Sequence, residues 1–94
     1  MRFDLLLEIP LVNAEGNPVG RMLKSLPRKP KYLPRVGEKV YVLPSRFLEV
    51  KEVTYQGLSL YMVHLVLESL DEKFRNELET LPSNHKDSHW RWLE

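Results

Sequence analysis

Apolar and polar residues alternate at the start of the chain. Across residues 3–11 every odd position is apolar, whereas Asp4 and Glu8 fall on the opposite face. A period of two residues is typical of a half-buried strand. The segment 13–20, NAEGNPVG, is rich in turn-forming residues, so a second strand over about 19–26 is expected to fold back as a hairpin partner.

Alternation returns after a proline-containing connection. One strand is expected over about 39–43 and another over 47–57. In the later strand the apolar phase reverses between Val50 and Val53 without any loss of β propensity. Such a slip indicates a β-bulge or a sharp bend, where one strand serves both sides of a curled sheet.

The segment 58–67, LSLYMVHLVL, is apolar on both faces. A strand of this kind is central to its fold, or it is covered by another element or by a second subunit. His64 interrupts the run. A catalytic base needs a nucleophile, an orienting acid and a pocket, and Met62 and Val66 on its face offer no such chemistry, so a hydrogen-bonded core or interface histidine is favoured.

The hydrophobic period changes to that of a helix over residues 69–81. Ser69 and Glu72 have the spacing of a capping box, and Pro82 ends the pattern. A helix with this pattern presents one apolar stripe, made here of Leu70, Phe74, Leu78 and Leu81. The stripe is expected to pack on the second face of the 58–67 strand.

These elements predict an α+β fold that is mostly β. We expect a small, strongly bent, mostly antiparallel sheet of about five strands, closed or nearly closed, with one C-terminal helix. Residues 1–82 would form a single globular domain, and 83–94 a tail. The segments PRVGEKVYV and FLEVKEVTY resemble those of SH3-like small barrels, which implies a partly open barrel.

Composition agrees with one small soluble domain. The chain has 94 residues, 43% of them hydrophobic and 29% charged, a net charge of +1 and no cysteine. Disulfides and thiolate chemistry are therefore excluded. No apolar stretch approaches the ~20 residues of a membrane span, and the N-terminal run lacks the features of a signal peptide. A cytoplasmic protein without membrane contact is expected.

Positive charge is concentrated around SLPRKPKYLPRVG, residues 25–37. No acidic residue occurs between Glu15 and Glu38. One interpretation is a nucleic-acid contact, in which the cations bind phosphates and Tyr32 stacks on a base. The other is a solvated, proline-stiffened connector, which the absence of any nucleic-acid-binding motif favours. The residues of the nucleic-acid alternative are Arg21, Lys24, Arg28, Lys29, Lys31, Tyr32 and Arg35.

Two tryptophans near the end of the sequence suggest a contact surface. Trp90 and Trp92 flank Arg91, and each can bury about 150–250 Å² of surface. The segment folds back on its own barrel, docks on a second subunit, or binds another partner. We take Trp90, Arg91, Trp92 and Tyr61 of the doubly apolar strand as candidate partner-binding residues.

Neither a catalytic nor a metal site is expected. His85 and His89 have i, i+4 spacing, but Pro82 precedes them and no third ligand is apparent, so a solvated tail is favoured. No cofactor motif occurs. The leading hypothesis is a non-enzymatic binding or assembly module of unknown protein partner, with a homodimer as one arrangement. The alternative is a nucleic-acid-binding accessory protein.

Overall fold

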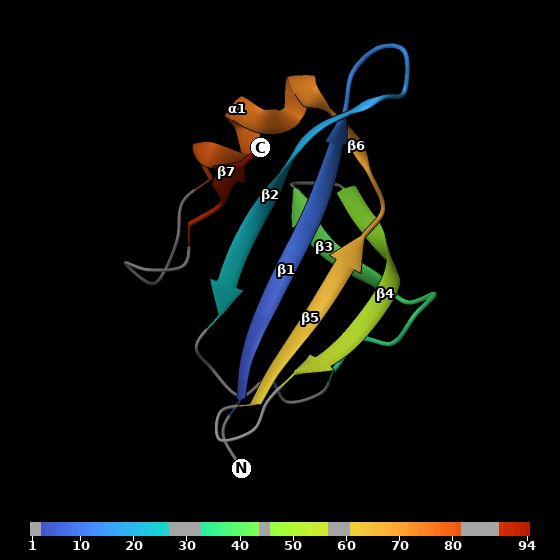
Figure 1. The fold of residues 1–94 in the computed structure, drawn as a ribbon, viewed down its shortest axis with the longest axis vertical. Coiled ribbons are helices and arrows are strands. Elements are labelled where there is room, and N and C mark those ends of the chain that lie inside the picture. The colour runs from blue at the N-terminus through green and yellow to red at the C-terminus, as the bar shows by residue number, and fades with distance from the viewer. Residues whose placement is uncertain (1–2, 27–32, 44–45, 57–60, 82–88) are drawn as a thin grey trace.

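The computed structural model describes residues 3–26, 33–43, 46–56, 61–81 and 89–94. The fold is mostly β, a strongly curled open sheet that forms a half-barrel with one short α-helix (Figure 1). The strands are β1 (Phe3–Val12), β2 (Pro18–Leu26), β3 (Lys39–Leu43), β4 (Arg46–Gln56), β5 (Tyr61–Leu67), β6 (Leu70–Asp71) and β7 (Arg91–Leu93). A 3₁₀ turn, η1 (Glu72–Phe74), leads into α1 (Arg75–Glu79).

The predicted fold class is confirmed, but the sheet is open and mixed and has seven strands where about five were expected. The sheet order is β3-β4-β5-β1-β2-β7, and β6 pairs with β1. The expected β1–β2 hairpin forms, and β3–β4 and β4–β5 are also antiparallel, but β1 and β5 are parallel. The β4–β5 hairpin returns β5 in the direction of β1, so a mixed sheet results.

A tight turn explains the predicted β1–β2 hairpin. The Asn13 side chain accepts hydrogen bonds from the backbone N–H groups of Glu15 and Asn17, each at 3.0 Å. Gly16 adopts φ = 84°, a left-handed conformation that a side chain disfavours. The turn sets a register in which Ile9 lies opposite Met22.

The predicted phase reversal in β4 is confirmed as a register shift. Val50 pairs with Leu67, but Glu52 pairs with Val66, so Lys51 is the extra residue of a β-bulge. Val50 is buried before the bulge, and Val53 packs against the same core after it. The bulge lets one long strand follow the curl of the sheet.

The helical segment begins later than predicted. Leu70–Asp71 is extended and pairs with the end of β1. The proposed Ser69 cap is therefore wrong: Asp71 caps the turn, and its carboxylate accepts a hydrogen bond from the Lys73 N–H at 2.9 Å. Pairing with β1 competes with helix formation over these residues. The apolar stripe itself is confirmed, because its members are all buried in or packed against the core.

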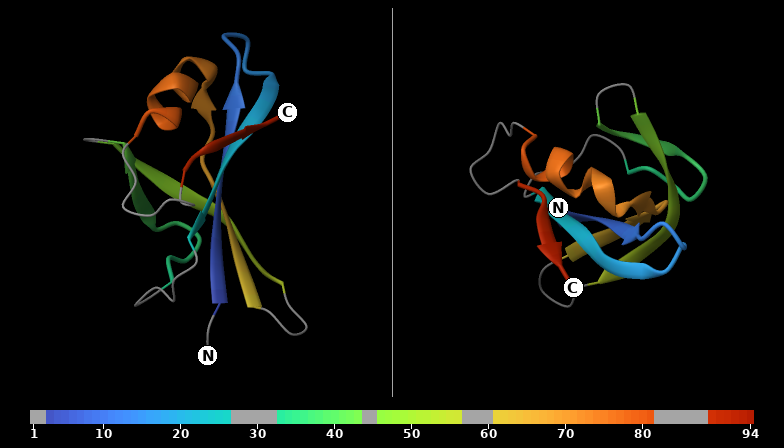
Figure 2. Two further views of the ribbon diagram at one scale, coloured as in Figure 1. Left: turned by 90° about the vertical axis from the view of Figure 1, so that its left-hand side faces the viewer. Right: turned by 90° about the horizontal axis from the view of Figure 1, so that it is seen from above.

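The core lies inside the curl of the sheet. It is built from the odd-numbered residues of β1, from alternate residues of the other long strands, and from the helical segment. Its buried members are Leu5, Leu7, Ile9, Leu11, Met22, Leu43, Leu48, Val50, Val63, Leu65, Leu67, Leu70, Leu78 and Trp90. The helix thus packs on the Val63–Leu65–Leu67 side of β5, the inner side (Figure 2). Among the residues described, no helix combines the length and apolar character needed to span a membrane.

Candidate interaction surface

The three central strands β2, β1 and β5 have an open face opposite the core. Figure 2 shows η1, α1, β3 and most of β4 on one side of these strands, with no described helix or strand over the other. We call this second side the outer face. Its apolar residues include Leu6, Leu23, Met62 and Val66, which are half-buried and lie outside the core cluster.

The strand registers align five side chains of the outer face into one row across the sheet. Leu23 of β2 and Val66 of β5 both pair with Glu8 of β1. Arg91 of β7 pairs with Leu23, and Glu52 of β4 pairs with Val66. The row therefore reads Arg91, Leu23, Glu8, Val66, Glu52, with a cation at one end and an acid at the other.

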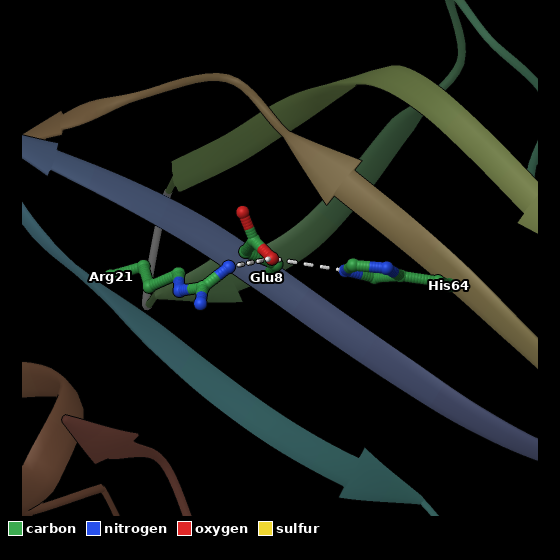
Figure 3. Close-up of polar contacts among 3 residues, drawn as sticks. All are labelled: Glu8, Arg21 and His64. Atoms are coloured by element: carbon green, nitrogen blue, oxygen red, sulfur yellow. Dashed lines mark hydrogen bonds and ion pairs between the residues drawn. The ribbon is translucent and has the colours of Figure 1, made fainter. Parts of the chain in front are cut away.

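Glu8 is the polar centre of this face (Figure 3). Its Oε1 atom lies 3.0 Å from His64 Nε2 and 3.4 Å from Arg21 Nη1. The Glu8 side chain is only 12% exposed, against 21% for His64 and 46% for Arg21. A carboxylate this far from water needs such partners, and β5 and β2 each supply one. The predicted hydrogen-bonded role of His64 is confirmed.

The hydrogen-bond partner that the structure describes for His64 is Glu8. Thr54 of β4 is the cross-strand neighbour of His64, and no hydrogen bond between these two described side chains is present. In the portion of the chain that can be described, no group of three or more potential ligand side chains is arranged to hold a metal ion. His89 is exposed, and His85 lies outside the described residues.

The tryptophan segment packs on its own chain, the first of the three predicted arrangements. β7 pairs with β2, with Trp92 opposite Met22. Trp90 is 6% exposed and belongs to the core, and the Lys24 ammonium lies 5.8 Å from its ring centroid. Trp92 is half-buried, whereas Arg91 is exposed on the outer side. The side chain of Tyr61 lies outside the described residues.

A glycine makes room for Trp92. A Cβ atom at Gly20 would overlap the Cζ2 and Cη2 atoms of the indole. The Arg75 guanidinium lies 4.3 Å from the ring centroid, on a helix otherwise distant in sequence, and bonds Glu79 at 2.8 Å. Gly20 and Arg75 therefore form the site in which the Trp92 ring packs.

Two depressions adjoin Trp92. One of about 370 Å³ lies between β2, η1 and β7 and is lined by Val19, Asp71, Glu72, Lys73, Arg75 and Trp92. The other, about 290 Å³, is lined by Leu23, Arg91, Trp92 and Leu93. The second depression includes Leu23 and Arg91, so it lies at the end of the outer face that carries Arg91.

The predicted basic set does not gather on one surface over its described members. Arg21 lies on the outer face beside Glu8, whereas Lys24 lies on the inner side beside Trp90. Arg35 is exposed near β3, and its backbone N–H donates to the Glu38 carboxylate at 2.7 Å. Arg28, Lys29, Lys31 and Tyr32 lie outside the described residues. The nucleic-acid alternative stays a prediction.

Sequence reasoning missed an exposed aromatic pair on the β3–β4 hairpin. Tyr41 and Phe47 are 58% and 56% exposed, and their ring centroids are 5.1 Å apart in an edge-on arrangement. The two residues are register partners. Each alternates with inward-facing neighbours, so the period of two could have placed both on the outer side.

In comparisons with known proteins, no family model matches the chain, and neither a curated protein nor a solved structure is significantly similar to it. The resemblance to SH3-like barrels therefore stays a prediction. Functional inference rests on the geometry described above.

Proposed function

We propose that the protein is a non-enzymatic binding or assembly module whose contact surface is the outer face. One observation carries this proposal: the apolar side chains of three adjacent central strands have no described element over them. Central strands carry strong β-formers on both faces when both faces are covered. A covering partner would complete the pattern that the sequence of β5 displays.

The polar centre of the outer face is suited to burial. Glu8 already has partners in Arg21 and His64, so a docking protein need not supply a donor to it. An unsatisfied carboxylate would instead oppose removal of water. Contact with a partner would therefore bury mainly the four surrounding apolar side chains, at about 25 cal/mol per Å² of apolar surface.

Site-specific photo-crosslinking tests this proposal. A benzoylphenylalanine at Val66, in the middle of the outer face, should give a discrete crosslinked protein species in cells that make the full chain. The matched control carries the same residue at Tyr55, which is exposed near the end of β4. Tyr55 pairs with the buried Val63 and so does not belong to the outer face. The proposal is contradicted if benzoylphenylalanine at Val66 gives no crosslinked species, or gives no more of it than benzoylphenylalanine at Tyr55.

A further inference from the structure

We infer that the outer face pairs with the outer face of a second copy of this chain, about a two-fold axis parallel to β1. This inference rests on the proposed function and names its partner. The order of charges across the sheet identifies this partner. A symmetric contact places the same surface on both sides, so that surface must be complementary to itself.

The cross-sheet row through Glu8 has the required order. Arg91 and Glu52 are exposed at its two ends, and neither forms an ion pair within the described ranges. Leu23 and Val66 are half-buried and flank Glu8. With strands about 4.8 Å apart, each charged residue is about 10 Å from the centre of the row, measured along the curled sheet.

The charges select one orientation of the axis. Rotation by 180° about a line above Glu8 and parallel to β1 exchanges the two ends of the row. Arg91 of each copy then lies over Glu52 of the other, and Leu23 lies over Val66. An axis perpendicular to the strands would instead place Arg91 over Arg91 and Glu52 over Glu52, which is repulsive.

The neighbouring row fits the same axis. It runs from Ser25 through Leu6 and His64 to Thr54. Rotation places Leu6 over its own counterpart, and Ser25, a hydroxyl donor and acceptor, over His64. Packing of this kind keeps the strands of the two sheets nearly aligned, as in β-sandwiches.

Two like-charged contacts lie on the axis, because Asp4 and Glu8 both belong to the outer face of β1 and each faces its own counterpart. Each Glu8 carboxylate is bound by Arg21 and His64 of its own chain, which lowers the repulsion between the two Glu8 residues. The contact therefore gains two Arg91–Glu52 pairs at its edges, which must outweigh the Asp4–Asp4 repulsion near the start of β1.

Paired charge reversals test the inference. Sedimentation equilibrium of the full chain is expected to show a monomer–dimer equilibrium. R91E and E52R each place two like-charged pairs in the dimer, so each should raise the dimer dissociation constant about tenfold or more. A mixture of the two variants should form a heterodimer with both pairs restored, detected by native mass spectrometry, and the double variant R91E/E52R should again form a homodimer.

Two matched controls use exposed residues away from the outer face. R35E and E77R are the same reversals near β3 and in α1, and should leave the dissociation constant unchanged. All altered residues are exposed, so far-ultraviolet circular dichroism should match that of the parent chain. Comparison of these variants separates the effect of charge at the interface from the effect of the net charge of the chain.

Three results overturn the inference: a monomer at every concentration, a dimer that neither reversal weakens, or variants that weaken but do not form the heterodimer. Failure of the proposed function is a different observation, because it is the absence of any crosslinked species from Val66. If Val66 crosslinks to a protein other than this chain and the purified chain is a monomer, only the inference that the partner is a second copy is refuted.

Discussion

Leu6 and Leu7 are neighbours on the central strand, yet their environments differ completely. Leu7 is buried in the core, together with Ile9 and Leu11, which are fully inaccessible to solvent. Leu6 shares the outer face with Glu8, where every described side chain of β1 is only half-buried. The same backbone thus carries a closed face and an open one.

This difference shows how a half-barrel uses its two sides. Curling encloses the inner face, and the helical segment and Trp90 complete it. Over the described part of the chain, the outer face is covered only by the side chains of adjacent strands, so its burial comes from cross-strand neighbours. The inner face accordingly contributes mainly to folding stability, and the outer face is the one that we propose for assembly.

The largest expected effect comes from shortening the inner leucine. Leu7→Ala should lower the free energy of unfolding by about 2–5 kcal/mol, because it removes buried methyl groups and leaves a cavity. Leu6→Ala, the matched change on the outer face, should cost about 1 kcal/mol or less. Urea denaturation at low protein concentration measures both.

Concentration sharpens this comparison. If the outer faces pair, the cost of Leu6→Ala should grow as the protein concentration rises, because dimerisation stabilises only the folded chain. Equal losses for both variants at low concentration would mean that the two faces are equally covered.

The edge of the inner face provides a second, smaller effect. Gly20→Ala should lower the free energy of unfolding by about 1–3 kcal/mol, because the added methyl group overlaps the Trp92 ring. The loss should be smaller in a Trp92→Leu background, where the ring is absent. A double-mutant cycle by urea denaturation measures the coupling, and an unchanged loss in that background would show that the two residues do not interact.

The smallest effect is expected at the exposed pair Glu49–Lys51. The Lys51 ammonium donates a hydrogen bond to Glu49 at 2.9 Å, and this bond lowers the pKa of the Glu49 carboxyl. Because that pKa is lower in the folded chain, any stabilisation is present above the unfolded pKa and is lost as the pH falls through the folded one.

Lys51→Met should therefore raise the pKa of Glu49 toward its usual value, with no measurable change in stability at neutral pH. Carboxyl titration by NMR tests the first statement, and urea denaturation tests the second. An unmoved Glu49 pKa would show that the pair does not form in solution.

Local patterns predicted much of the fold. The odd-numbered apolar residues of β1, the turn before β2, the phase reversal in β4 and the apolar stripe of the helix all follow from side-chain periodicity, and each is found. Periodicity records which residues share a face, and burial of that face is nearly obligatory. Competition from β6 pairing was not visible, which is why the helix start was misplaced.

The candidate surface depended on information that no local pattern contains. Glu8 and His64 are 56 positions apart and meet only because β5 lies parallel to β1. Arg91 and Glu52 reach the same row through two further strand pairings. The sequence by itself determined which residues face the core, because alternation is a property of each strand. Only the tertiary structure decided which strands are neighbours and in what register, because those pairings depend on contacts between segments that are distant along the chain.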